Sequence, residues 1–218
     1  MRTFGKIPSN MNPRWCNECE AFARTHLGGI ETRFSMLFAD IRGSTSLAEH
    51  MKSTEFRALI DRFFASATNV LARSDAMIDK LAGDQVSGYF FPGVIGPGYP
   101  RVAVQSAQEL LRLTGHGSPR GPWIPVGVGV HTGYAFYGSV GAPGGVVDVT
   151  ALGDAVNIAA RLASNAGPGE ILVSQETCSD AGLDLGDLER RELNLKGRIE
   201  PVSVYVLSGD EIGFHSRG

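Results

Sequence analysis

The chain has 218 residues, of which 43% are hydrophobic and 20% charged, enough apolar material for one compact domain with a full core. A formal net charge of −3 excludes the strongly basic surface that holds nucleic acid non-specifically. No run of residues suits a membrane span, and the polar N-terminus lacks the apolar core of a signal peptide, so we expect a cytoplasmic protein that binds neither nucleic acid nor membrane.

The first expected element is a short helix between Asn12-Pro13 and Gly28-Gly29. Asn12 suits the N-cap, Pro13 suits the first helical position, and a glycine ends the helix. This helix belongs to an N-terminal extension over residues 1–33.

The expected helix contains the pair Cys16-x-x-Cys19. An odd total of three cysteines argues against a secreted disulfide framework. Three interpretations of the pair remain: packing, a metal shared between copies with His26 completing a half-site, and redox sensing. Packing is preferred because Cys19 shares a helical stripe with Trp15 and Phe22.

A short apolar run over 35–40 predicts a central strand that ends in the carboxylate Asp40. A long helix capped by Ser53 follows it, because apolar residues recur at helical spacing. Those residues are Phe56, Leu59, Ile60, Phe63, Phe64, Ala67, Val70 and Leu71.

The segments 76–81 and 85–91 predict two strands joined in a tight hairpin at Gly83-Asp84. A Gly/Pro-rich loop over 92–99 leads to a second helix over 100–114, and a strand over 124–132 then ends at a turn around Gly133. Further strands are expected over 134–140, 146–150, 170–174, 188–195 and 201–207, with a helix over 152–165.

The central order of strand, helix, hairpin, helix and strand is typical of an α+β fold. It predicts a ferredoxin-like βαββαβ core with a mainly antiparallel sheet and helices on one face.

Two carboxylates stand where this plan brings them together. Asp40 ends the first strand and Asp84 lies in the hairpin, which neighbours that strand in a ferredoxin-like sheet. Paired aspartates without nearby histidine or cysteine suit a hard cation such as Mg²⁺ or Mn²⁺. The alternative is that Asp84 is a turn former and Asp40 a helix cap.

The segment Ile41-Arg-Gly-Ser-Thr45 directly follows Asp40. A turn of small residues at Gly43, Ser44 and Thr45 entering a helix presents backbone N–H groups, which favour phosphate. A single glycine is also compatible with an ordinary turn.

Three segments together resemble the class III adenylyl and guanylyl cyclases. They are FADIRGST over 38–45, DKLAGD over 79–84 and TALGDAVNIAARL over 150–162. The resemblance extends over about 34–207, and it implies a catalytic domain over residues 34–208 followed by a tail over 209–218.

The resemblance implies roles for the carboxylates and for one helix. Asp40 and Asp84, with the carbonyl of Ile41, match the positions that bind two Mg²⁺ or Mn²⁺ ions. Asn157 and Arg161 match the pair that orients the ribose and stabilises the transition state, and their i, i+4 spacing places both on one helical face. A surface ion pair is the alternative for Arg161.

Lys80 and Thr150 match the base-reading positions of the family. A lysine donates to adenine N1 and a threonine hydroxyl accepts from the exocyclic amine, so the resemblance implies ATP as the substrate. Thr150 departs from the aspartate of animal adenylyl cyclases and resembles a mostly bacterial subgroup. Lys196 matches a late position that contacts the triphosphate, whereas Tyr134 stands where some relatives place a phosphate-binding arginine.

The family plan further implies a homodimer with active sites shared between its two chains. One chain contributes the metal ligands and its partner contributes Lys80, Thr150, Asn157 and Arg161. The sequence therefore predicts an adenylate cyclase that converts ATP to cyclic AMP and pyrophosphate. A catalytically silent nucleotide-binding module and a guanylate cyclase are the alternatives; a diguanylate cyclase or polymerase palm lacks support because the Gly-Gly-Asp/Glu-Glu-Phe hairpin is missing.

Overall fold

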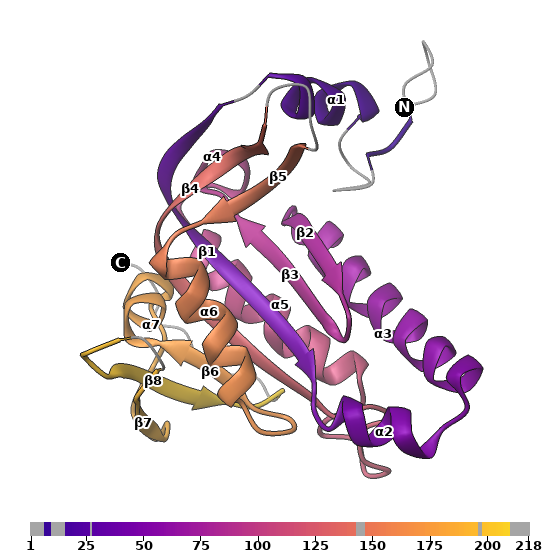
Figure 1. Cartoon of the computed structure of the whole chain (residues 1–218). Helices are drawn as coiled ribbons and strands as arrows, with labels where there is room; N and C mark the ends of the chain where they lie inside the picture. Colours follow the sequence, from indigo (N-terminus) through magenta and orange to yellow (C-terminus); the bar gives the residue numbers. More distant parts are fainter. Residues whose placement is uncertain (1–6, 10–15, 27, 143–146, 196–197, 210–218) are drawn as a thin grey trace.

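The computed structural model describes residues 7–9, 16–26, 28–142, 147–195 and 198–209. Their strands form one eight-stranded sheet in the order β2-β3-β1-β4-β6-β8-β7, with β5 paired to β4 (Figure 1). The strands are β1 (Gly29–Ile41), β2 (Met77–Ala82), β3 (Gln85–Phe90), β4 (Val126–Gly141), β5 (Val147–Leu152), β6 (Ile171–Ser174), β7 (Arg190–Leu193) and β8 (Val202–Leu207). The helices are α1 (Asn17–Thr25), α2 (Ser44–His50), α3 (Ser53–Arg73), α4 (Pro92–Ile95), α5 (Tyr99–Leu113), α6 (Asp154–Asn165) and α7 (Gln175–Ala181).

The central β1-α3-β2-β3-α5-β4 order confirms the ferredoxin-like prediction. Strand β1 lies between β3 and β4 and runs antiparallel to both. Of the ladders in the described ranges, only that between β4 and β6 is parallel. The sheet is therefore mainly antiparallel, as the sequence predicts.

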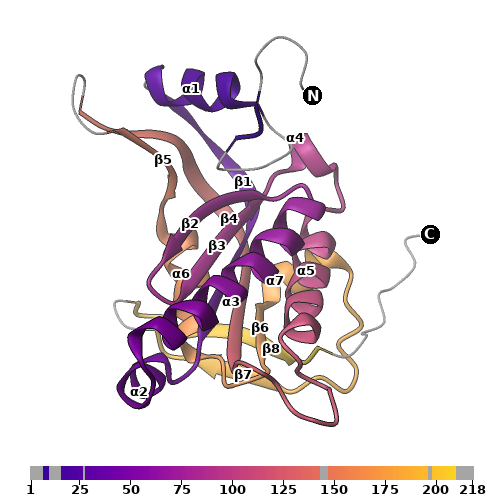
Figure 2. The same cartoon turned by 90° about the vertical axis from the view of Figure 1, so that its right-hand side faces the viewer.

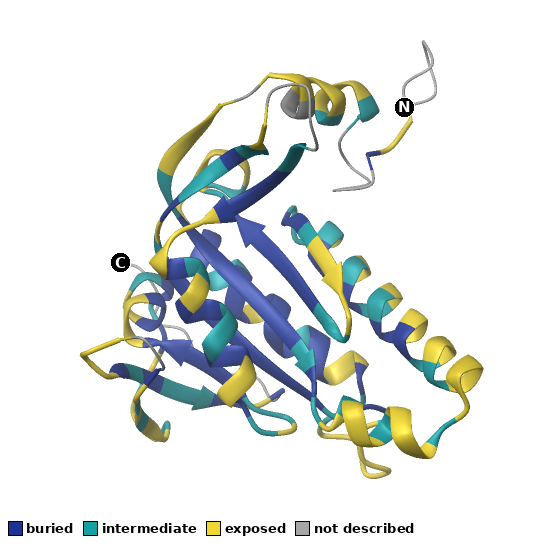
Figure 3. Ribbon diagram, viewed as in Figure 1, coloured by how far each residue is buried: buried dark blue, intermediate teal, exposed yellow. Residues whose placement is uncertain are grey.

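Helices cover both faces of the sheet, so the expectation of helices on one face is wrong (Figure 2). Side chains alternate along β1: Leu37 packs toward α3 and α5, whereas Met36 packs on the face covered by α6. Figure 3 shows the buried central strands between these layers. Helix α6 lies close to β4, because a Cβ on Gly129 would fall 2.3 Å from the backbone nitrogen of Ala163.

Strand β4 continues through the segment where the sequence predicts a turn. The β1–β4 ladder pairs Phe34 with Gly133 and Ser35 with Thr132 without interruption. Two predicted strands are thus one, and its outer part pairs with β5 from Phe136↔Leu152 to Gly141↔Val147. We call residues 136–141 and 147–152 the β4–β5 arm.

A chain of buried side-chain hydrogen bonds crosses the sheet from β1 to β6. Ser35 Oγ lies 2.7 Å from Thr132 Oγ1, which accepts from Thr177 Oγ1 at 3.0 Å. Thr177 Oγ1 lies 3.0 Å from Ser174 Oγ, and Ser174 Oγ lies 2.8 Å from His131 Nδ1. Burial lowers the pKa of His131 to about 4. The imidazole is therefore neutral in the folded protein at pH 7.

We expect the free energy of unfolding to fall as the pH drops from about 6.5 toward 4. In this window the unfolded chain binds a proton on His131 that the folded chain does not, which costs up to about 3 kcal/mol. Denaturant titrations at pH 7, 6 and 5 measure this loss. In the His131→Gln variant the free energy of unfolding should depend less steeply on pH than in the parent protein. The control is His50→Gln, which changes an exposed histidine of α2 and should keep the pH dependence of the parent. The same pH dependence of the unfolding free energy in all three proteins would contradict this account of acid sensitivity.

Two predicted helix caps are wrong. Helix α1 begins at Asn17 with Cys16 as its N-cap, four residues after Pro13, so Asn12 does not cap it. Helix α3 begins at Ser53, and its N-cap is Lys52, whose backbone N–H donates to Glu55 Oε2 at 3.3 Å. The short helices α4 and α7 are not predicted from the sequence.

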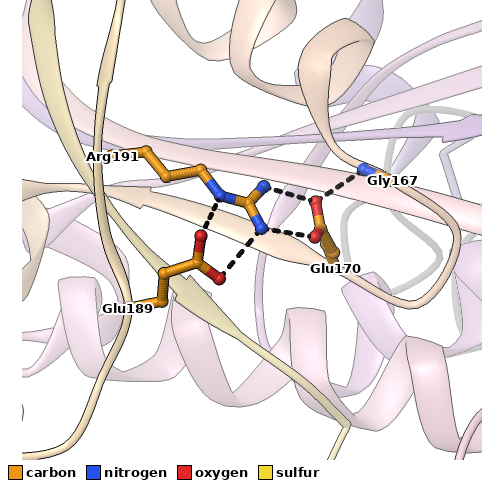
Figure 4. Close-up of polar contacts among 4 residues, drawn as sticks. All are labelled: Gly167, Glu170, Glu189 and Arg191. Atoms are coloured by element: carbon orange, nitrogen blue, oxygen red, sulfur yellow. Dashed lines mark hydrogen bonds and ion pairs between the residues drawn. The ribbon is translucent and has the colours of Figure 1, made fainter.

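Arg191 on β7 forms hydrogen bonds with Glu170 in the loop before β6 (Figure 4). Arg191 Nη1 and Nη2 donate to the two oxygens of Glu170 at 2.9 and 2.8 Å, and Arg191 Nε donates to Glu189 Oε1 at 2.7 Å. The hydrogen bonds from Arg191 lower the pKa of Glu170, and the N–H of Gly167 donates to the same carboxylate at 2.8 Å. This bidentate pairing holds the outer part of the sheet together.

None of the helices within the described ranges is long and apolar enough to cross a membrane.

Candidate active site

Asp40 and Asp84 meet at one end of the sheet. Asp40 pairs in register with Gln85, the residue after Asp84, and the Ile41 N–H donates to the backbone oxygen of Asp84 at 3.2 Å. Burial raises the pKa of the Asp40 carboxyl, the Arg42 guanidinium opposes this, and the nearby Asp84 carboxylate raises the pKa further. The sequence-based expectation that the strand and hairpin bring these two aspartates together is confirmed.

Arg42 lies beside the carboxylate pair. Its Nη2 pairs with Asp40 Oδ2, and its Nη1 donates to the backbone oxygen of Ser164 on α6 at 2.9 Å. Its Nε is buried without a hydrogen-bond partner among the described residues. Arg42, for which the sequence predicts no role, links the end of β1 to α6.

The donor set at this end of the sheet suits a hard divalent cation. Its side-chain atoms are carboxylate oxygens, and a cation between Asp40 and Asp84 would relieve the repulsion that raises the pKa of Asp40. In the described part of the chain, no cluster of three or more His, Cys, Asp or Glu side chains is placed to hold a metal. Two carboxylates with further oxygens from water or substrate is the arrangement that Mg²⁺ commonly takes.

The turn after β1 enters a helix as expected. Gly43 has φ = 68° and is the N-cap of α2, and its carbonyl accepts from the Leu47 N–H at 3.0 Å. This left-handed backbone favours glycine at that position. Ser44 and Thr45 form the first turn of α2, next to the carboxylate pair in the chain.

Lys80 of β2 and Thr150 of β5 line one pocket of about 210 Å³. Thr150 is buried, whereas Lys80 is about half exposed and its Nζ lies 3.1 Å from Asp148 Oδ2. The wall includes Tyr89 of β3. Two residues 70 positions apart, selected from the sequence as a base-reading pair, thus lie at the same pocket.

A bulge in β2 explains how neighbouring residues both reach this pocket. Ile78 pairs with Gly88 and Leu81 with Val86, which leaves Asp79 and Lys80 opposite the single residue Ser87. Regular strand alternation would direct the two side chains to opposite faces. Both line the pocket instead.

Asp79 also lines the pocket, although the sequence predicts no role for it. Its Oδ2 accepts hydrogen bonds from Ser87 Oγ at 3.1 Å and from Tyr89 Oη at 2.9 Å. Its Oδ1 is buried without a hydrogen-bond partner in the described structure. Burial, followed by the charge of Asp79, raises the pKa of Tyr89, so this phenol remains a hydrogen-bond donor. The sequence shows the motif around Asp79, but it does not predict the bulge that places the Asp79 side chain at the pocket.

Asn157 and Arg161 lie one turn apart on α6. Asn157 is exposed and Arg161 half-buried, whereas the opposite side of the helix packs on the sheet through Ala155 and Ala159. Within the described residues, no hydrogen bond or ion pair joins Asn157 or Arg161 to either aspartate of the carboxylate pair or to the pocket pair. Within one chain the predicted site residues therefore form three separate groups: the carboxylate pair, the pocket pair and the pair on α6.

The late basic position, Lys196, lies outside the described residues. Its neighbour Arg198 pairs through Nη1 with Asp154 Oδ2 in the first turn of α6. Tyr134 is 66% exposed.

Residues 31–209 match the family model described as the adenylate and guanylate cyclase catalytic domain. An adenylate cyclase from Anabaena cylindrica is 30% identical over 192 residues, which cover 82% of this chain and 38% of that protein. The chain thus spans little more than a third of the length of that curated relative.

Two solved structures are similar in fold. The adenylyl cyclase CyaB from P. aeruginosa has a TM-score of 0.71 at 27% identity, covering 88% of this chain and 98% of that one. The guanylyl cyclase Cya2 has a TM-score of 0.72 at 23% identity, covering 83% of this chain and 93% of that one. Both nucleotide specificities are therefore represented among proteins of this fold.

Proposed function

Since the chain belongs to the adenylate and guanylate cyclase catalytic domain family, we propose that it is an adenylate cyclase. In this reaction the ribose 3′-oxygen of ATP bonds to the α-phosphorus, the bond from that phosphorus to the β-phosphate oxygen breaks, and pyrophosphate leaves. The observation that carries the choice of ATP is the joint lining of one pocket by Lys80 and Thr150.

Asp40 and Asp84 would hold divalent ions, Mg²⁺ or Mn²⁺ and two per site, with the backbone oxygen of Ile41 as a further ligand. Such ions, when bound, make the attacking hydroxyl more acidic and neutralise charge on the leaving phosphates. The buried end of β1 fixes Asp40, and the tight hairpin fixes Asp84 against it. The Arg42–Asp40 ion pair balances part of the negative charge of the two carboxylates.

Gly43, Ser44 and Thr45 are proposed to contact the triphosphate through the backbone N–H groups that begin α2. Lys196 supplies a further positive charge to the phosphates in this proposal. Arg42 is already fixed between Asp40 and Ser164, at the start of the same turn.

Asn157 and Arg161 are proposed to orient the ribose and to stabilise the charge that develops on the phosphate oxygens. Both project from the exposed side of α6, and no described contact joins them to the carboxylate pair of the same chain. This separation supports a homodimer in which α6 of one chain completes the site of its partner. Phosphoryl chemistry then occurs only where two chains meet.

The base-reading pair leads to a prediction about substrate choice. In the proposed complex Lys80 donates to adenine N1 and the Thr150 hydroxyl accepts from the exocyclic amine, whereas guanine presents the opposite pattern. Each unsatisfied buried group costs about 1–3 kcal/mol, so we expect kcat/KM for ATP to exceed that for GTP on the order of 10²-fold. Steady-state rates with each nucleotide measure the ratio.

Variants at the pocket separate hydrogen bonding from packing. Thr150→Ser keeps the hydroxyl and should keep the ATP preference, whereas the isosteric Thr150→Val should lower it. Lys80→Glu should erode the preference further, and Lys52→Glu, which changes an exposed lysine at the start of α3, is the matched control. Comparable kcat/KM for ATP and GTP in the unmutated protein would leave a cyclase whose base is not read by this pair.

A further inference from the structure

The first turn of α1 places two thiols side by side. Cys16 is the N-cap, and its Sγ accepts a hydrogen bond from the Cys19 N–H at 3.4 Å. The Sγ atoms of Cys16 and Cys19 lie 3.2 Å apart. A disulfide between them requires the two sulfurs to approach from this distance to about 2.05 Å.

The surroundings of the pair correct the interpretation that Cys19 packs in the interior. Cys19 is exposed and Cys16 partly exposed, and Phe22, on the proposed packing stripe, is 61% exposed. Figure 1 shows α1 at the outer end of the molecule, beside the β4–β5 arm. Both sulfurs are therefore close to solvent, where they can meet a reactant.

Among the described residues, no third His, Cys, Asp or Glu side chain joins the two cysteines in a metal-binding cluster. His26 lies at the opposite end of α1, where its Nδ1 is 3.0 Å from the Phe22 backbone oxygen. Its ring stacks on Phe22 with centroids 3.8 Å apart. The expected half-site of two cysteines and His26 is not formed, which leaves the two thiols as the reactive groups.

We propose that Cys16 and Cys19 form a thiol–disulfide exchange site that reacts with a low-molecular-weight disulfide such as glutathione disulfide. The Cys16 thiolate attacks one sulfur of glutathione disulfide, giving a mixed disulfide and releasing one glutathione thiolate, which takes up a proton. The Cys19 thiolate then attacks Cys16 Sγ, closing the Cys16–Cys19 disulfide and releasing the second glutathione. Two protein thiols are oxidised and one glutathione disulfide is reduced to two thiols.

The start of α1 favours this order of attack. Negative charge on Cys16 Sγ is stabilised by the hydrogen bond from the Cys19 N–H and by the positive end of the helix dipole. Cys19 lies one turn into the helix, on the exposed side, and is placed to resolve the mixed disulfide.

Cys178 provides an internal contrast. It is fully buried in α7, and burial raises the pKa of its thiol to about 12. A buried, protonated thiol is a poor nucleophile toward an external disulfide. We therefore expect oxidation to be confined to the α1 pair.

The test uses the full chain, fully reduced and then equilibrated in buffers of graded glutathione to glutathione disulfide ratio. Samples are acid-quenched, unfolded, labelled with maleimide and weighed by mass spectrometry. At oxidising ratios we expect one label per chain in place of three, with no bound glutathione, and peptide mapping should find Cys16 joined to Cys19. Cys178→Ser should close the same disulfide.

A single cysteine variant should stop the reaction at the mixed disulfide. Cys19→Ser should stop at a glutathione adduct on Cys16, and circular dichroism establishes that each variant is folded. Failure to form the Cys16–Cys19 disulfide at every ratio would overturn the proposal, as would equal glutathione addition at Cys178. Tight binding of Zn²⁺ by the reduced chain at one ion per two chains, with protection of both thiols from labelling, would instead identify a shared metal site.

Discussion

Replacing Asp40 or Asp84 by asparagine is expected to lower cyclic nucleotide formation on the order of 10²-fold or more while the fold is retained. Asparagine keeps the shape of each side chain but removes the charge that is proposed to attract a divalent cation and, through it, the substrate phosphates. Initial rates at saturating Mg²⁺ and Mn²⁺ measure the loss. The effect should be in kcat as well as KM, because the lost interaction strengthens in the transition state.

Asp61→Asn is the matched control for the two carboxylate variants. Asp61 is exposed on α3 and pairs with Arg57 one helical turn away, so its replacement should leave the rate unchanged. Thermal unfolding separates lost chemistry from lost structure, since Asp40→Asn also removes the charge that faces Arg42. Retention of more than about a tenth of the activity in both carboxylate variants would rule out this pair as the metal-binding site.

Mixing two inactive variants is expected to restore activity. Asp40→Ala removes a proposed metal ligand and Arg161→Ala removes the proposed transition-state donor, so each homodimer should be inactive. In a mixed dimer one site carries both lesions and the other carries neither. Random exchange of equal amounts makes half of the dimers mixed, so about a quarter of the parent activity should return.

Subunit exchange has to be measured independently in the mixing experiment, for example by co-purification of two differently tagged chains. A mixture of Asp40→Ala and Asp84→Ala is the matched control, because both lesions then fall in the same half of the site and no intact site forms. Absence of rescue by Arg161→Ala in chains that do exchange would show that a single chain supplies both halves.

The central topology could be predicted because its elements carry distinct periodicities. Phe63 and Ala67 repeat at helical spacing and are buried in α3, and the apolar run ending at Asp40 is a central strand. The hairpin signal at Gly83-Asp84 then sufficed to place both aspartates together, because a ferredoxin-like sheet sets the first strand beside that hairpin. Local patterns and one topological rule were enough.

The missed features depend on interactions between distant segments. Gly133 resembles a turn residue locally, but its pairing with Phe34 keeps it within a strand. The bulge at Asp79 and Lys80 depends on the register between β2 and β3, which neither segment specifies alone. Likewise, the predicted cap Asn12 is wrong because α1 begins at Asn17, which makes Cys16 the N-cap.

The most direct test of the account is product analysis with the unmutated chain. Purified protein is incubated separately with ATP and GTP, in the presence of Mg²⁺ or Mn²⁺, and the nucleotides are separated by chromatography and identified by mass. The account predicts that ATP yields 3′,5′-cyclic AMP and pyrophosphate in equal amounts, and that GTP reacts on the order of 10²-fold more slowly. Bound but unconverted ATP with both ions, in protein shown to be dimeric, would contradict it and identify a catalytically silent nucleotide-binding module.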